Sequence, residues 1–141
     1  MNVIEDQDNS TGEPVLKRPE IDQDAYPTIL QILPALGGSG GVERGTVEIA
    51  GAIVEAGGRA IVASEGGLQT HDLKRVNADH VTLPMASKNP FVMYRNIKRI
   101  ADLIRQERVD IVHVRSRAPA WSAYFACKRA RKPLLTTFHG T

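Results

Sequence analysis

Short apolar segments alternate with helix-like segments along the chain from Thr28 onward. The apolar segments are rich in β-branched residues and have the length of strands in a parallel sheet; they span residues 28–33, 59–63, 81–83, 109–114 and 134–138. The segments between them repeat apolar residues every three or four positions, as helices do, and span residues 42–56, 72–77, 90–107 and 119–132. This alternation predicts an α/β fold, a doubly wound, mostly parallel, Rossmann-like sheet with helices on both faces.

The first of these strands runs directly into a glycine-rich loop. Glycine fills four of the five positions from Gly37 to Gly41, and a helix is expected to begin there. Glycine lets the backbone approach a ligand closely, and a helix start offers free N–H groups to phosphate. The loop therefore indicates a phosphate or nucleotide-sugar site, and Arg44 in the first turn of the helix is a candidate to bind phosphate. The alternative is a flexible turn without a ligand.

Two further loops follow strands of the same expected sheet. Arg115 and Arg117 come after the fourth strand, and His139 and Gly140 come after the fifth. Because the carboxyl ends of parallel strands meet at one edge, these loops are expected to lie near the glycine-rich loop. Strand alternation would place both arginines on one side as a two-pronged anion contact, and solvated surface arginines are the alternative. His139 is a candidate to hydrogen-bond a substrate hydroxyl or phosphate, or to orient its loop.

Other chemistries find little support in the sequence. The dinucleotide fingerprint G-x-G-x-x-G fails at Glu43, so a nicotinamide enzyme, with Glu65 holding a ribose, is only an alternative. No residues have the spacing of a zinc site, and no metal is expected. Aromatic residues make up 5% of the chain without a stacking pattern, so nucleic acid is not an expected partner. His113 is interpreted as a packed strand residue, and His71 and His80 receive no role.

Charge divides the chain into an acidic opening and a basic body. Residues 1–27 hold seven acidic and two basic side chains, which predicts a disordered acidic tail in front of a domain over residues 28–141. No stretch resembles a signal peptide or a membrane-spanning segment. The single cysteine, Cys127, is interpreted as a packed thiol and fits a cytoplasmic location.

The segment from Pro90 to Glu107 is the clearest expected helix. Its apolar stripe consists of Met93, Ile97, Ile100, Ala101 and Ile104. Its basic side chains are Arg95, Lys98, Arg99 and Arg105. This basic face indicates peripheral contact with anionic lipid, for which an ordinary solvated face is the alternative. The next expected helix carries Trp121, Tyr124, Phe125 and Cys127.

Four segments, taken in order, resemble one known family. They are the Gly-Gly-Val-Glu-Arg helix start at Gly40–Arg44, the segment Leu83–Pro90 that ends in Lys-Asn-Pro, the run Asp110–Trp121, and Thr-Thr-Phe-His-Gly at Thr136–Gly140. Together they resemble the amino-terminal domain of a family-four, retaining, nucleotide-sugar-dependent glycosyltransferase with the GT-B fold. The resemblance covers residues 28–141.

The resemblance implies two Rossmann-like domains that face each other across a cleft. The second domain, absent from this chain, would grip the donor mainly through the paired glutamates of an E-x₇-E motif, and the first would present the acceptor. Gly40 and Gly41 would lie beside the donor diphosphate, and His139 near the transferred sugar as the catalytic residue. The family works without a bound metal or cofactor. The expected partners are a nucleotide-sugar donor, a glycan or lipid-linked acceptor and the missing carboxyl-terminal domain.

On this basis the chain is expected to supply the acceptor-side half-site of a hexosyltransferase-type enzyme. Its domain looks incomplete at the carboxyl end, so the chain alone is expected to be inactive. Cell-envelope polysaccharide or lipopolysaccharide biosynthesis, in the cytoplasm or at the inner face of the cell membrane, is the expected setting. The alternatives are a stand-alone nucleotide- or anion-binding Rossmann-like module and a fragment of an NAD-dependent oxidoreductase.

Overall fold

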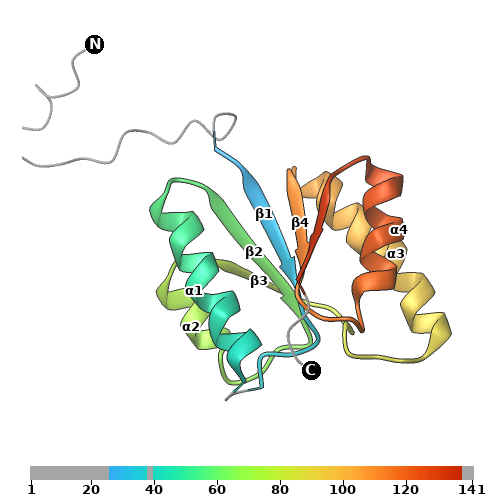
Figure 1. The fold of residues 1–141 in the computed structure, drawn as a ribbon, viewed down its shortest axis with the longest axis horizontal. Coiled ribbons are helices and arrows are strands. Elements are labelled where there is room, and N and C mark those ends of the chain that lie inside the picture. Colours follow the sequence, from blue (N-terminus) through green and yellow to red (C-terminus); the bar gives the residue numbers. More distant parts are fainter. Residues whose placement is uncertain (1–25, 38–39, 138–141) are drawn as a thin grey trace, which may run out of the picture.

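The structure, a computed structural model, describes residues 26–37 and 40–137. Its strands form one parallel sheet in the order β3-β2-β1-β4-β5, with bounds β1 Thr28–Ile32, β2 Arg59–Ser64, β3 Asp79–Thr82, β4 Ile111–Val114 and β5 Leu134–Thr136. The helices between them are α1 Gly41–Glu55, α2 Thr70–Arg75, α3 Pro90–Gln106 and α4 Ala120–Ala130 (Figure 1). The predicted α/β fold is confirmed.

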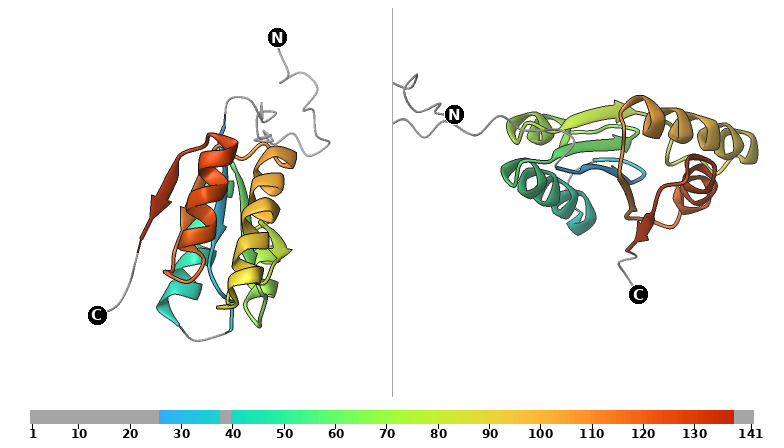
Figure 2. Two further views of the ribbon diagram at one scale, coloured as in Figure 1. Left: turned by 90° about the vertical axis from the view of Figure 1, so that its right-hand side faces the viewer. Right: turned by 90° about the horizontal axis from the view of Figure 1, so that it is seen from above.

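The sheet is covered by two helices on each face. Figure 2 shows α1 and α2 on one side of the strands and α3 and α4 on the other. Side chains alternate along β1, so that Leu30 and Ile32 enter the core under α3 and α4, whereas Leu33 enters the core under α1 and α2. The core under α3 and α4 contains more buried residues, and the long aliphatic stripe of α3 supplies much of it.

The order of the strands reverses at β1. The chain moves from β1 through β2 to β3 on one side and then crosses over to β4 and β5 on the other. Ile32 at the end of β1 pairs with Val114 at the end of β4, so the two carboxyl ends are level with each other. Ligands of open α/β sheets bind at such a switch point, outside the carboxyl ends of the strands.

Capping residues explain where the long helices begin and end. The Asn89 side chain accepts a hydrogen bond from the Phe91 N–H (2.9 Å), and Pro90 occupies the first turn of α3, where a missing N–H costs nothing. Arg131 closes α4 in the left-handed conformation, with φ of 59°, and Pro133 follows. These signals lie within a few neighbouring residues, which is why the sequence located both helices well.

The predicted element bounds need small corrections. Val109 is buried but belongs to the turn between α3 and β4, because its N–H donates to the Ile104 carbonyl (2.9 Å), so β4 begins at Ile111. Pro27, assigned to the tail, joins the fold by accepting a hydrogen bond from the Arg59 N–H (3.1 Å). The rest of the predicted tail, residues 1–25, lies outside the described residues.

Candidate functional site

The candidate site lies at the carboxyl ends of β1 and β4, where the strand order reverses. The loop after β1 leads into α1, and Arg115 directly follows β4. Two of the three loops predicted to converge are therefore neighbours. The third, with His139 and Gly140, lies outside the described residues, so their predicted roles stay predictions.

Backbone hydrogen bonds hold the start of the glycine-rich loop. The Leu36 N–H donates to the Gly66 carbonyl (2.9 Å), and the Glu65 N–H donates to the Pro34 carbonyl (2.9 Å), which ties the loop after β1 to the loop after β2. Gly67 adopts φ of 145° and lies against the Leu36 backbone, so a side chain there would be both strained and obstructed. The chain therefore enters the glycine-rich loop from a fixed position.

The first turn of α1 is open to a ligand on one side. Gly40 is the N-cap residue of α1 and, as a glycine, has no side chain that could cap the helix. The Glu43 carboxylate folds back over Gly40, and a β carbon at position 40 would collide with it. A β carbon at Gly41 would meet no atom within 4 Å. The described part of the protein would therefore accept a side chain at position 41, and a bound ligand is what would require glycine there. A phosphate that reached Gly40 would have to displace Glu43, which now uses the favourable end of the helix dipole.

Arg115 is a buried cation without a counter-ion among the described residues. Its side chain is 5% exposed, and its Nε has no hydrogen-bond partner. Burial lowers the pKa of its guanidinium, because the charged form loses solvation that no neighbouring carboxylate replaces. A buried charge is costly unless it is paired, so the binding of an anion would offset this cost.

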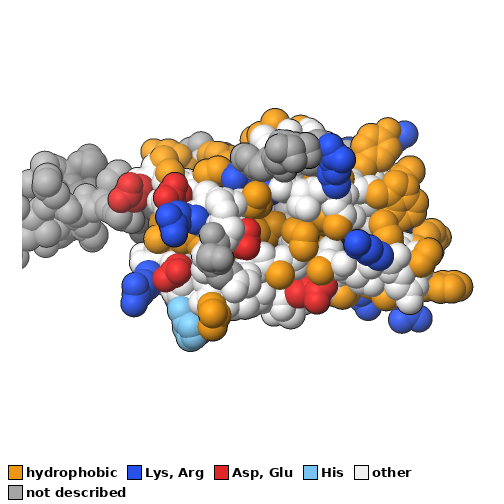
Figure 3. Space-filling model, turned by 60° about the horizontal axis from the view of Figure 1, so that its bottom comes forward, with side chains coloured by type: hydrophobic (Ala, Val, Ile, Leu, Met, Phe, Trp, Pro, Cys, Tyr) orange, Lys and Arg blue, Asp and Glu red, His pale blue; other side chains and the backbone are white. Residues whose placement is uncertain are grey.

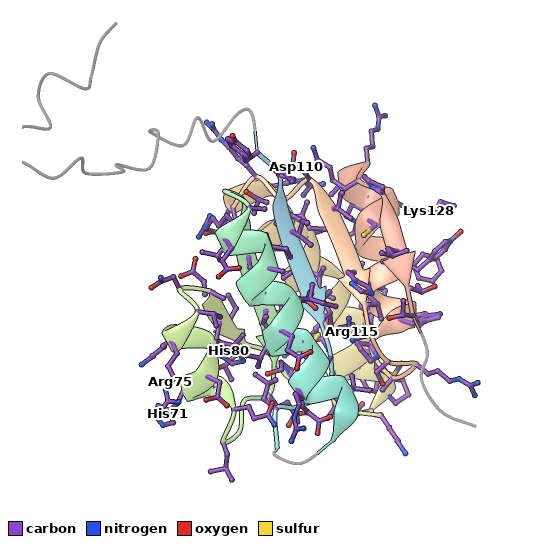
Figure 4. All side chains as sticks on the ribbon, turned by 60° about the vertical axis from the view of Figure 1, so that its left-hand side comes forward. His71, Arg75, His80, Asp110, Arg115 and Lys128 are labelled. Atoms are coloured by element: carbon purple, nitrogen blue, oxygen red, sulfur yellow. The ribbon has the colours of Figure 1, made fainter. Side chains whose placement is uncertain are left out.

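Gly45 makes room for this guanidinium beside α1. A β carbon at position 45 would lie 3.0 Å from Arg115 Nη2, closer than real β carbons comfortably approach. Figure 4 shows Arg115 beside α1. The sequence interpretation missed Gly45, because a glycine in mid-helix has no local signal that distinguishes a packing role from a weak helix position.

A polar stripe continues from this position along the α1 side of the sheet. Gln31 is fully buried, and its Nε2 donates to the Thr46 carbonyl of α1 (3.1 Å) while its Oε1 has no partner. Its neighbour in register on β4 is His113, whose Nε2 lies 2.9 Å from Thr137 Oγ1. The packed role predicted for His113 is confirmed, and its contact fixes the segment that leads toward His139.

The two arginines after β4 do not form the expected two-pronged contact. Arg117 is exposed, whereas Arg115 is buried, because both lie beyond the end of the strand and strand alternation no longer applies. Arg44 is also exposed, on the first turn of α1. Of the three predicted arginines, Arg115 is the buried one.

Other candidate groups serve the fold. Glu65 accepts a hydrogen bond from the Ala86 N–H (2.7 Å), which ties it to the loop after β3 and weighs against a role in holding a ribose. His80, given no role from the sequence, lies 2.7 Å from Ser64 Oγ, and burial lowers its pKa. Cys127 is buried, which raises the pKa of its thiol to about 11 and agrees with a packed role. Within residues 26–37 and 40–137, no group of three or more His, Cys, Asp or Glu side chains could hold a metal.

One surface hollow is remote from this site. It measures about 640 Å³ and lies at the amino ends of the strands, beside Thr28, Arg59 and Asp110. Arg59, in its lining, forms ion pairs with both Asp79 and Glu107. We therefore regard this hollow as part of the structural framework of the domain and not as a ligand site. None of the helices described is long and apolar enough to pass through a bilayer.

Comparison with known proteins gives one family and several structural likenesses. A sequence model described as Glycosyltransferase Family 4 matches residues 39–141. A crystal structure of a glycosyltransferase from Rickettsia africae ESF-5 is 46% identical, with a TM-score of 0.74; the match covers 82% of this chain and 30% of that one. The chain thus spans less than a third of that enzyme. A comparison with curated proteins found no match.

Two less similar structures share the fold alone. MurG from Acinetobacter baumannii is 17% identical, with a TM-score of 0.63, over 82% of this chain and 37% of that one. The carboxyl-terminal domain of the PF1911 hydrogenase from Pyrococcus furiosus is 19% identical, with a TM-score of 0.60, over 89% of this chain and 100% of that domain. Proteins with unrelated names therefore share this sheet, and the fold by itself does not decide the reaction.

Proposed function

Because the chain belongs to Glycosyltransferase Family 4, we propose that it takes part in transferring a hexose from a nucleotide-sugar donor to a glycan or lipid-linked acceptor, with retention of anomeric configuration. The chain supplies the amino-terminal, acceptor-side half of the site. A carboxyl-terminal domain supplies the main grip on the donor. The nucleotide-sugar is a co-substrate, and no metal or bound cofactor takes part. The setting is envelope polysaccharide or lipopolysaccharide synthesis in the cytoplasm, at the inner face of the cell membrane.

The observation that carries this proposal is the unpaired guanidinium of Arg115 beside the first turns of α1. A side chain at Gly45 would obstruct it, and no described carboxylate pairs with it. A phosphate fits this position chemically, because arginine and helix N–H groups both bind phosphate oxygens. The phosphate comes either from the donor diphosphate or from an anionic acceptor, and kinetics with each substrate separates the two.

In the proposed reaction the bond between the anomeric carbon and the diphosphate oxygen breaks, and the acceptor oxygen forms the new bond on the same face of the sugar. Negative charge grows on the leaving diphosphate in the transition state. The N–H groups at Gly40 and Gly41 and the guanidinium of Arg115 stabilise that charge if the donor phosphate binds here. His139 donates or accepts a hydrogen bond at the sugar or its phosphate. The acceptor proton leaves with the diphosphate or with solvent.

The test compares the chain alone with the chain joined to the remaining part of the Rickettsia africae enzyme. We expect sugar transfer from a nucleotide-sugar only by the joined protein, and weak nucleotide binding by the chain alone. His139→Ala in the joined protein should lower turnover by roughly tenfold to a thousandfold, or about 1.4–4 kcal/mol of transition-state stabilisation. Tight, saturable nucleotide binding by the chain alone, with no transfer by the joined protein, would instead favour a stand-alone anion-binding module. Tight binding of NAD would favour the oxidoreductase alternative.

A further inference from the structure

Five exposed aromatic side chains gather on α3 and α4. Phe91 is 82% exposed, Tyr94 66%, Trp121 46%, Tyr124 48% and Phe125 39%. The whole chain has only seven aromatic residues, so most of them stand on this one surface. Figure 3 shows hydrophobic side chains gathered at the right-hand end of the molecule, with lysine and arginine side chains around them. The described residues leave these five side chains uncovered.

The two helices that carry these side chains pack against each other. Ser122 Oγ of α4 donates a hydrogen bond to the Met93 carbonyl of α3 (2.8 Å), which joins the two helices near their starts. On α4, the ring of Phe125 lies with its centroid 5.1 Å from that of Trp121 and 5.1 Å from that of Tyr124, both edge to face. The three aromatic side chains of α4 therefore form one cluster.

Basic side chains extend the same surface toward the ends of the helices. Together α3 and α4 carry six Lys or Arg residues and one acidic residue, Asp102, which is paired with Lys98 (3.0 Å). A hollow of about 470 Å³ lies among them, lined by Tyr94, Arg95, Lys98, Arg99, Asp102 and Arg129. We call the aromatic and basic residues of the two helices the aromatic–basic surface: Phe91, Tyr94, Arg95, Lys98, Arg99, Arg105, Trp121, Tyr124, Phe125, Lys128 and Arg129.

We propose that the aromatic–basic surface docks on an anionic lipid bilayer. Aromatic rings with polar edges settle at the level of the lipid headgroups, and nearby lysines and arginines bind anionic headgroups. A second copy of the chain fits less well, because it would bring two clusters of positive charge together. The opposite helix α1, by contrast, carries three glutamates and one arginine. The charge of the aromatic–basic surface thus favours anionic lipid over pairing with the same surface of a second copy.

The position of the surface also connects it with the proposed function. Helices that follow parallel strands begin at the carboxyl edge of the sheet, where Arg115 and the first turn of α1 lie. Phe91 and Trp121 stand in the first turns of α3 and α4, and so on the side of the surface nearest that edge. Docking would hold the half-site close to an acceptor carried by lipid. This last step rests on the proposed function, whereas the docking itself does not.

Trp121 is the only tryptophan of the chain and reports directly on docking. The 141-residue chain is titrated with vesicles of phosphatidylcholine alone and of phosphatidylcholine with phosphatidylglycerol, without donor or acceptor. With anionic vesicles we expect a blue shift of the emission and quenching by doxyl-labelled lipids. With neutral vesicles, or in high salt, binding should weaken at least about tenfold, because headgroup attraction is screened. Because no sugar substrate is present, the outcome does not depend on whether the protein transfers sugar.

Variants separate the two parts of the surface. Lys128→Gln with Arg129→Gln should weaken binding to anionic vesicles by about tenfold to thirtyfold, at roughly fivefold per basic residue. Phe91→Ser with Tyr94→Ser should weaken it by about tenfold while Trp121 still reports. The matched controls lie on the opposite side of the molecule: Lys74→Gln with Arg75→Gln on α2, and the exposed Leu68→Ser. Figure 4 labels Lys128 and Arg75 at opposite sides. These controls should leave binding unchanged.

Three results would overturn the proposal. The first is an unchanged emission with anionic vesicles at low salt. The second is a control pair that weakens binding as much as the Lys128 and Arg129 pair, which would make the attraction a property of total charge. The third is a blue shift without lipid that grows with protein concentration, which would assign the surface to a second copy of the chain. Circular dichroism of each variant confirms that it is folded like the parent.

Discussion

The two helical layers of this domain have opposite characters. The layer of α3 and α4 has an almost wholly aliphatic interior and an aromatic and basic exterior. The layer of α1 and α2 has a smaller apolar core and places buried polar side chains, Gln31 and Arg115, against the sheet. The two layers share one sheet, so the difference comes from the residues that each helix presents to it. One layer buries more apolar residues, and the other also buries polar side chains against the sheet.

This contrast bears on where a functional site can form. A cation without a partner destabilises the layer that holds it, and such a cost is typical of groups kept for a ligand. On the α3–α4 side the buried polar groups are satisfied: Ser122 donates to the Met93 carbonyl, and Asn96 Nδ2 donates to the Pro84 carbonyl (3.1 Å). Among the described residues, the buried side-chain atoms without a hydrogen-bond partner include Gln31 Oε1, Thr70 Oγ1 and Arg115 Nε, which lie on the α1–α2 side.

The largest effect is expected from a core truncation that compares the two layers. Ile100→Ala, on the core side of α3, should lower the free energy of unfolding by about 2–5 kcal/mol. Leu73→Ala, on the six-residue helix α2, should cost less, because a short helix moves more easily into the space left behind. Urea denaturation of both variants measures the difference. An equal or larger cost for Leu73→Ala would contradict the unequal division of stability.

Removing the buried charge should stabilise the protein without ligand. Arg115→Met keeps an unbranched side chain and removes a cation that no described carboxylate pairs with, so we expect the free energy of unfolding to rise by about 1–2 kcal/mol. The same variant should lose affinity for phosphate-bearing ligands. Thermal denaturation with and without pyrophosphate measures both effects. A loss of stability in Arg115→Met would show that the guanidinium has a structural partner.

Gly45→Ala tests the space beside the guanidinium. The added methyl group should displace Arg115 and weaken pyrophosphate binding by roughly tenfold, or about 1.4 kcal/mol. The free energy of unfolding should change by less than about 1 kcal/mol, because alanine favours a helix and offsets part of the crowding. Gly41→Ala, where the structure shows open space, is the control for stability. Unchanged binding in Gly45→Ala would separate Arg115 from the anion.

The smallest effect is expected for His80, on β3. Burial holds the pKa of His80 below its ordinary value of 6.5. Below pH 6.5 the unfolded chain therefore binds more protons than the folded one, and stability falls as the pH decreases through that window. His80→Gln should reduce this dependence, and His71→Gln, at an exposed position, should not. The urea denaturation midpoints of the parent, His80→Gln and His71→Gln are measured between pH 5 and 7.5. The same dependence of the midpoint on pH in all three proteins would contradict this prediction.

The elements of the fold could be predicted from the sequence, but the details of the site could not. β-branched runs, helix caps and Pro133 act over a few neighbouring residues, so strands and helices were located to within a few positions. Gly45 and Arg115 are separated by about half of the chain, and the pairing of β1 with β4 brings them together. The sequence also could not predict that Trp121 and Phe125 are exposed. An aromatic residue in a helix can face either the core or the solvent, and the packing of distant elements decides which.

The measurement that tests the account most directly is a titration of the ¹⁵N-labelled chain with inorganic pyrophosphate, followed by NMR. The account predicts that the Nε–H signal of Arg115 and the amide signals of Gly40 and Gly41 shift along one binding curve. It also predicts that the glycine shifts weaken in Arg115→Met and in Gly45→Ala. An Arg115 signal that stays unchanged while the glycine amides shift, or glycine shifts that persist in Arg115→Met, would contradict the claim that the buried guanidinium and the start of α1 form one anion site.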